Sequence, residues 1–196
     1  TMLISLVSGF LVADNSVYDA YKKGFDKYNV EYINFVTADK LSDETIDKLE
    51  KENKVKIYDQ RYYELKESKR NATIRIYGER KSVNKLCVMS GKLAKKDDEI
   101  ALDRVFAKNN NYKVGDNITI DKNTYKITGF IAMPDYSCVF EDNADMMFDS
   151  VNFGVASMMD NGLSKLKESK LSYCYAVKYN KKPESDKKQK DMSDDF

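Results

Sequence analysis

The clearest alternation of apolar and polar residues lies in two neighbouring segments, YKVGDNITI and TYKITGFI. This period of two is typical of β-strands that bury one face. The polar turn 121–123 separates the segments, and the sequence therefore predicts a β-hairpin. In this hairpin Ile118 and Ile120 would lie opposite Tyr125 and Ile127.

Two helices are predicted near the start of the chain. The first, capped by Asn15 or Ser16, carries an apolar stripe at near-helical spacing, made of Val17, Tyr21, Phe25 and Tyr28. The second begins after Ser42 as N-cap, with Asp43 and Glu44 in its first turn, where carboxylates are favourable. Leu41 precedes this cap and is expected to pack on Ile46 as a hydrophobic staple.

Further strands are predicted on both sides of the hairpin. The stretches 54–65 and 71–77 are rich in β-forming residues, and Ile74 and Ile76 alternate with Arg75, so we expect adjacent antiparallel strands. The predicted strand, helix and strand that follow the hairpin are Val151–Met158, Leu163–Lys170 and Ser172–Tyr179. With the strand Glu31–Thr37 and the second helix, the outer parts form a β-α-β-β and a β-α-β pattern. These patterns predict an α+β fold of the split βαβ type.

The middle of the chain has an organisation of its own. Ile100–Leu102 is expected to be a short strand, and Asp103 is expected to cap a helical turn in which Val105 and Phe106 face inward. Together with the hairpin, this gives a compact block from about Cys87 to Met133. We therefore predict a small β-rich lobe inserted between the two halves of the outer pattern.

Composition excludes several kinds of chemistry. The chain has no His, which removes Ser-His-Asp and Cys-His nucleophilic sites and His-containing zinc sites. Its 33 Lys and Arg balance 32 Asp and Glu, so the chain lacks the positive field that nucleic-acid binding requires. No GxxxxGK[ST] phosphate-binding loop is present.

The cysteines and the acidic residues give no specific site. Cys87, Cys138 and Cys174 are far apart and form no CxxC pair. The densest group of carboxylates lies in one segment and consists of Glu141, Asp142, Asp145 and Asp149. It lacks the spacing and the central Gly of an EF-hand, which favours a solvated loop over a calcium site. No cofactor is expected.

The two ends of the sequence differ in character. The run MLISLVSGFLV is nearly uncharged, but about 11 residues are too few to cross a bilayer, which needs roughly 20. Two interpretations remain for residues 1–12: a buried strand or helix, or the outer end of a truncated membrane helix. The charged tail KKPESDKKQKDMSDDF is expected to be solvated.

The blocks EIALDR and VGDNITI to ITGF, within Gly91–Ser137, resemble the extracytoplasmic domain of FtsX-like and MacB-like permeases of ABC transporters. The segments LVSGFLVADNSVYDAYKKGFDKYNVEYINF and FEDNADMMFDSVNFGVA are similar to members of this family from Gram-positive bacteria. The resemblance implies that residues 1–12 end a membrane helix. It also implies a discontinuous porter-like lobe, 13–86 and 136–196, and a small inserted MacB-like lobe, 87–135.

The resemblance further implies a non-catalytic domain on the extracellular face of the cell membrane. Such a domain would transmit ATP-driven motion to an extracellular substrate or partner protein. Its partners would be the permease's own transmembrane helices, a separate ATP-binding subunit, a second permease in a dimer and an unknown accessory protein. The candidate partner surface consists of Pro134, Asp135, Tyr136, Glu141, Asp142 and Asp145. The alternative is a free-standing extracellular binding module, with Tyr-rich strands and the turn 134–136 as its ligand surface.

Overall fold

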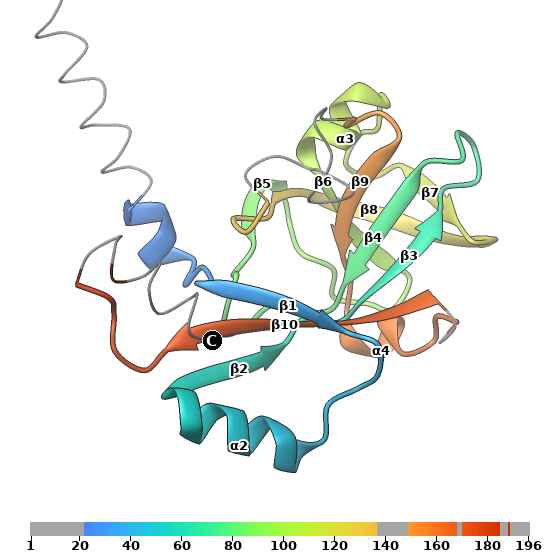
Figure 1. Cartoon of the computed structure of the whole chain (residues 1–196). Helices are drawn as coiled ribbons and strands as arrows, with labels where there is room; N and C mark the ends of the chain where they lie inside the picture. The colour runs from blue at the N-terminus through green and yellow to red at the C-terminus, as the bar shows by residue number, and fades with distance from the viewer. Residues whose placement is uncertain (1–21, 137–148, 168–169, 185–187, 189–196) are drawn as a thin grey trace, which may run out of the picture.

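The computed structural model describes residues 22–136, 149–167, 170–184 and 188. It has an α+β fold, as predicted, and the ten strands of this part of the chain form one hydrogen-bonded sheet, in which β2 and β7 pair with β10 and β8 outside the main strand order (Figure 1). In chain order the elements are β1 (Ile33–Thr37), α2 (Asp43–Asn53), β2 (Val55–Asp59), β3 (Tyr62–Lys66), β4 (Thr73–Tyr77), β5 (Cys87–Gly91), β6 (Glu99–Asp103), α3 (Arg104–Asn109), β7 (Asn117–Ile120), β8 (Asn123–Ala132), β9 (Phe153–Ser157), α4 (Asp160–Leu163) and β10 (Leu171–Tyr179).

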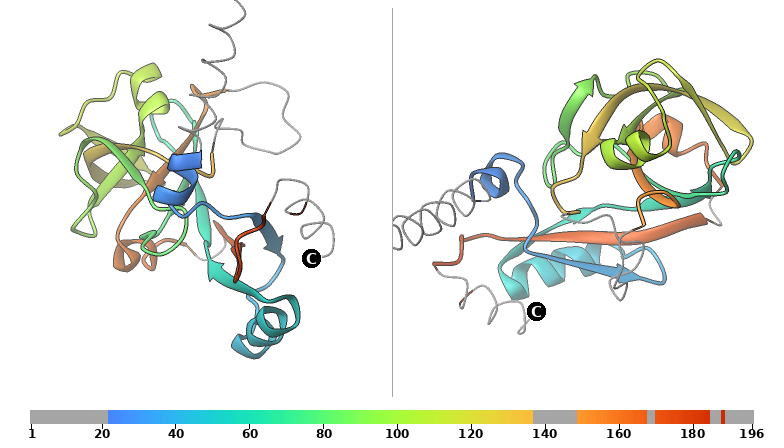
Figure 2. Two further views of the ribbon diagram at one scale, coloured as in Figure 1. Left: turned by 90° about the vertical axis from the view of Figure 1, so that its left-hand side faces the viewer. Right: turned by 90° about the horizontal axis from the view of Figure 1, so that it is seen from above.

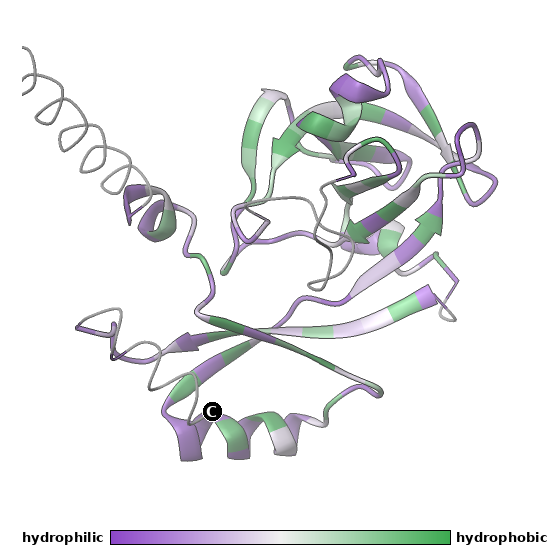
Figure 3. Cartoon of the chain, turned by 45° about the horizontal axis from the view of Figure 1, so that its top comes forward, coloured by the Kyte–Doolittle hydropathy of each residue, from purple (hydrophilic) through white to green (hydrophobic). Residues whose placement is uncertain are grey.

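The first unit of the fold is a split βαβ arrangement. Strands β1 and β2 both run antiparallel to the central β10, so they are parallel to each other and α2 connects them. The cap of α2 is the predicted one, because the Ser42 side chain accepts a hydrogen bond from the Thr45 amide. The helix alternates hydrophilic and hydrophobic stretches along its length (Figure 3), and Ile46 and Leu49 pack against a core that includes Val55, Tyr175 and Val177.

The second unit is a barrel made by β3, β4, β9, β6, β8 and β7 in that order. Strands β4 and β9 pair in parallel, as do β6 and β8, and the other pairs are antiparallel. The barrel closes where β7 meets the end of β3. There the Ser68 amide donates to Thr119 O (2.8 Å) and the Asp121 amide donates to Lys66 O (3.0 Å). In the view from above, Figure 2 shows this unit as a ring, with the long strand β10 running alongside it.

Side chains from all six strands fill the barrel. Ile74, Ile100 and Ile127 are fully buried in one cluster with Phe106 of α3. Asp103 caps α3, as predicted, by accepting bonds from the Val105 and Phe106 amides. Gly154 lets Phe106 approach the wall, because a Cβ at that position would lie 2.5 Å from the ring's Cγ.

The hairpin is tighter than predicted. Ile118 lies opposite Tyr125 as expected, but Ile120 pairs with Asn123 rather than Ile127. The reason is that Asp121 and Lys122 both adopt positive φ, 44° and 71°, which makes a two-residue turn. The strand β8 therefore begins at Asn123, one of the expected turn residues.

One predicted helix is misplaced. The expected helix Leu163–Lys170 is replaced by α4, which ends at Leu163. Asp160 occupies its first turn, where the helix dipole favours a carboxylate, and this carboxylate also accepts from the Glu79 amide (2.9 Å). Of the predicted first helix, Val17 and Tyr21 lie outside the described residues, and residues 22–27 are helical.

The long strand β10 connects the two units. Its residues 173–179 pair with β1 and β2, and its first residues pair with β3 of the barrel. The segment 87–135 shares its core with β3, β4 and β9, so Ile74 and Ala156 pack in the same cluster as Ile127. Whether 87–135 folds as a separate lobe stays a prediction. Within the described residues, no helix is long and apolar enough to span a membrane.

Candidate functional site

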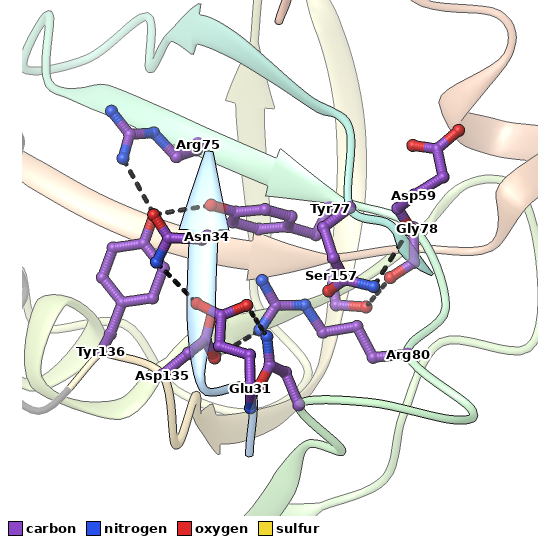
Figure 4. A network of polar contacts seen from close by, with 12 residues as sticks. Glu31, Asn34, Asp59, Arg75, Tyr77, Gly78, Arg80, Asp135, Tyr136 and Ser157 are labelled. Carbon is purple, nitrogen blue, oxygen red and sulfur yellow. Dashed lines mark hydrogen bonds and ion pairs between the residues drawn. The ribbon is translucent and has the colours of Figure 1, made fainter. Parts of the chain in front are cut away.

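A cluster of buried charges and hydroxyls lies between the outer face of the barrel and the split βαβ unit (Figure 4). At its centre Arg80, which follows β4, donates to Asp135 Oδ1 at 2.6 Å. The two side chains are only 2% and 8% exposed, and the guanidinium lies 4.1 Å from the Tyr77 ring centroid. Burial is the largest influence on the pKa of Arg80 and lowers it, but the charge and hydrogen bond of Asp135 together with Tyr77 and Tyr136 outweigh burial, and the net shift is upward.

A chain of hydroxyls continues this cluster along the barrel. Arg75, on the outer face of β4, donates to Tyr136 Oη at 2.8 Å, and the Tyr136 and Tyr77 hydroxyls are 2.6 Å apart. Arg75 also binds Glu64 of β3 and lies 4.5 Å from the Tyr62 ring centroid. Burial, followed by Tyr136, raises the pKa of Tyr77 well above its usual value. The residues after β8 are thereby fixed to the barrel wall.

A second set of contacts joins the cluster to the segment before β1. The Glu31 amide donates to Asn84 Oδ1 (2.9 Å), and Asn84 Nδ2 donates back to the Glu31 carboxylate (2.6 Å). The Asn84 and Lys85 amides donate to backbone oxygens of Asn29 and Tyr28. Since Asn84 is fully buried, this pairing clamps the chain after residues 22–27 onto the loop between β4 and β5.

Lys178 of β10 holds the same segment from the other side. Its ammonium group donates to Val30 O at 2.6 Å and lies 4.0 Å and 4.8 Å from the ring centroids of Tyr32 and Phe25. Burial among these groups lowers the pKa of Lys178 to about 8. Nearby, burial and the charge of Glu31 raise the pKa of Cys174 to about 11.

Beside the cluster lies a groove of about 730 Å³ between the two units. One side comes from the split unit and its connection to β3, with Asp59, Gln60 and Tyr173. The other side comes from the barrel, with residues 77–80 and the region of α4. Arg80 belongs to both the cluster and the groove.

The structure describes three of the six predicted surface residues. Pro134 lies in the turn that ends with the bond from the Tyr136 amide to Met133 O (3.0 Å). Asp135 and Tyr136 point into the cluster, where Arg80 and Arg75 bind them. The remaining three, Glu141, Asp142 and Asp145, lie outside the described residues.

No motif in the sequence marks Glu31, Arg80 or Asn84 as parts of a site. Arg75 alternates with Ile74 and Ile76, which is also the pattern of a strand with one solvent-exposed face. The sequence therefore gives no indication that the Arg75 side chain is largely buried. Within the described ranges, no group of three or more Cys, Asp or Glu side chains could hold a metal ion. The cluster is built from hydrogen bonds and ion pairs that fix distant segments relative to one another.

No protein-family model and no curated protein matches the sequence. Several solved structures are similar in part, among them the following three. The periplasmic region of MacB from Actinobacillus actinomycetemcomitans is 15% identical over 79% of this chain and 72% of that one, with a TM-score of 0.42. A putative lipoprotein from Bacillus anthracis is 13% identical over 77% and 84%, with a TM-score of 0.41. The extracellular domain of the noncanonic ABC-type transporter YknZ from Gram-positive bacteria is 13% identical over 83% and 87%, with a TM-score of 0.43.

Proposed function

We propose that this chain is the non-catalytic extracellular domain of an ABC transporter permease. In this role it transmits motion from the membrane side to an extracellular substrate or partner protein. The resemblance of the EIALDR and VGDNITI to ITGF blocks to FtsX-like and MacB-like permeases supports the proposal. Motion of this kind requires packed bodies joined by specific contacts.

One structural observation carries the proposal: polar contacts link the segment after residues 22–27, through the loop between β4 and β5, to the segment after β8. The path runs from Glu31 to Asn84, through the loop that also holds Arg80, and then to Asp135. A displacement at Glu31 would pull on the 80–84 loop because two short hydrogen bonds join Glu31 to Asn84, and a buried ion pair joins Arg80 of the same loop to Asp135. The motion would therefore reach Asp135 and Tyr136.

The other parts of the proposal follow from this role. ATP would be hydrolysed by a separate subunit, and the domain would be anchored at the extracellular face of the cell membrane by helices of the same permease, itself part of a dimer. The partner would contact the segment that begins at Pro134 and includes Glu141, Asp142 and Asp145. Such a surface would move with Asp135.

The test uses the intact protein encoded by the gene. Apolar segments of about 20 residues on both sides of this chain in the reading frame are expected for a permease; their absence would favour a free-standing binding module. In the intact protein, Asn84→Ala should preserve surface expression and ATP hydrolysis but reduce transport or signalling. Asn123→Ala, in the exposed hairpin, is the matched control. Normal transport by a well-expressed Asn84→Ala variant would contradict this path.

A further inference from the structure

Two buried polar atoms in the described part of the chain have no hydrogen-bond partner, and both belong to residues that line the groove. They are Gln60 Oε1 and Arg80 Nε. Buried polar groups are nearly always paired, since an unpaired one keeps the cost of its lost hydration. One of these atoms is an acceptor and the other is a donor. The lining of the groove therefore contains one unpaired donor and one unpaired acceptor.

The charges of the groove indicate that this group is neutral. Three cations, Lys40, Arg61 and Arg80, face three anions, Asp59, Glu79 and Asp160. The anions are already engaged: Asp59 pairs with Arg61, Glu79 with Lys81 at 3.1 Å, and Asp160 accepts from the Glu79 amide. An anionic ligand would gain from Arg80 but would face these carboxylates and leave Gln60 Oε1 unpaired.

The uncharged lining mixes polar groups with apolar side chains. Besides Gly78 and Ser164 it includes Tyr63, Tyr77, Leu163, Leu166, Leu171 and Tyr173. Rings and branched side chains of this kind bury apolar groups, while a few polar atoms fix orientation. An amide supplies a carbonyl acceptor for Arg80 and an N–H donor for Gln60, and a peptide joins such amides to apolar side chains.

We propose that the groove between the two units binds a neutral, apolar peptide segment, with Arg80 Nε donating to a backbone carbonyl and Gln60 Oε1 accepting from a backbone amide. Both atoms are enclosed, so the peptide reaches them as the groove widens. Widening separates walls that belong to different units, and peptide binding is thereby coupled to their relative position. The inference goes beyond the proposed function and holds equally for a transporter domain or a free-standing module.

The experiment titrates the full 196-residue chain, labelled with ¹⁵N, with the capped tripeptide N-acetyl-Leu-Tyr-Leu-amide. The Arg80 Nε–H and Gln60 side-chain amide resonances should shift together and saturate. Gln60→Leu should weaken binding about 5- to 10-fold, because one hydrogen bond is lost. The thermal midpoint of the free variant should equal or exceed that of the parent, because the unpaired buried oxygen is removed and the bond that is also lost, from Gln60 Nε2 to Asp59 O, is exposed. A purely structural Gln60 would show the opposite thermal shift.

Arg80→Lys keeps the charge beside Asp135 but removes the Nε donor, and it should weaken the same peptide by a similar factor. The matched control is Arg104→Lys, at an exposed position away from the groove, which should leave binding unchanged. Three results would overturn the proposal: shifts confined to other residues, no shift at millimolar peptide, which would leave the two atoms to bound water only, or saturable shifts with maltose in place of the peptide.

Discussion

Arg80 carries its positive charge into a region that water barely reaches, and Asp135 is the group that compensates it. Exposed ion pairs contribute little because solvent screens them, whereas removing one partner of a buried pair leaves an unpaired buried charge. Lys165 and Asp97 form a pair of the first kind, with side chains 69% and 39% exposed. Arg80 and Asp135, at 2% and 8%, form a pair of the second kind.

This difference predicts a large effect of one substitution. Asp135→Asn should lower the free energy of unfolding by about 3 kcal/mol, the lower end of the cost of breaking a buried pair. Asp97→Asn should change it by less than about 1 kcal/mol. Urea unfolding of the two variants, followed by circular dichroism, measures both. Equal effects would mean that solvent reaches Arg80 in the folded protein.

Lys178 should make the free energy of unfolding depend on pH. Its pKa is about 8 in the folded chain and 10.5 when unperturbed, because burial disfavours its charge. Between these values the unfolded chain holds the proton more tightly than the folded one, so the free energy of unfolding should rise with pH. Lys178→Met removes this rise. The measurement compares urea midpoints of the parent and the variant from pH 7.5 to 9.5, with Lys108→Met as an exposed control.

A parent and a Lys178→Met variant that respond identically to pH would show that Lys178 is ordinarily solvated. The test compares the pH dependence of the urea midpoint of the parent with that of the variant, because other groups also titrate in this range. Cys174, with its pKa raised to about 11 by burial, acts in the other direction: the unfolded thiol ionises first and stability falls as pH rises towards 11. This contribution is common to both proteins and cancels.

Among the elements, those whose signals are local were predictable. The cap of α2 needs only Ser42 and the three residues after it, and the hairpin needs only its alternating strands and a short turn. The barrel was not predicted as a closed ring. Its β4–β9 pair joins Thr73 to Phe153 in parallel, and no local pattern encodes contact over such a separation. The buried cluster depends on the same long-range pairings. The local alternation around Arg75 is therefore also that of a solvent-exposed side chain.

The hairpin turn also gives a prediction at this scale. Lys122 has φ of 71° and Asp121 has φ of 44°, a conformation that strains residues with a Cβ and suits glycine. Lys122→Gly should raise the free energy of unfolding by about 0.5–1 kcal/mol, after the extra entropy of glycine in the unfolded chain is subtracted. Thermal unfolding measures the change. Lys126→Gly, inside β8, should lower stability, and a gain in both variants would exclude the turn as the cause.

Across the whole molecule, two units with separate cores are joined by β10 and by the polar cluster. Their cores do not mix: Val55 and Val177 pack under α2, while Ile74 and Ile100 fill the barrel. The long strand β10 runs past both (Figure 2). The segment 28–31 is attached to the loop at 84–85 by four hydrogen bonds, two to the Asn84 side chain and two to backbone amides. Loss of this clamp should therefore release one segment without opening either core.

Hydrogen exchange tests this independence in the isolated chain. Asn84→Ala removes both side-chain bonds to Glu31, and the amides of residues 28–31 and 84–85 should exchange at least 10-fold faster, since losing two hydrogen bonds costs on the order of 2 kcal/mol locally. Amides of β4, β6 and β9 should keep their protection, because the barrel core is untouched. Asn123→Ala should change neither set. If β9 exchanges faster as well, the clamp belongs to the global fold, and a displacement at Glu31 would loosen the barrel instead of moving it as a body.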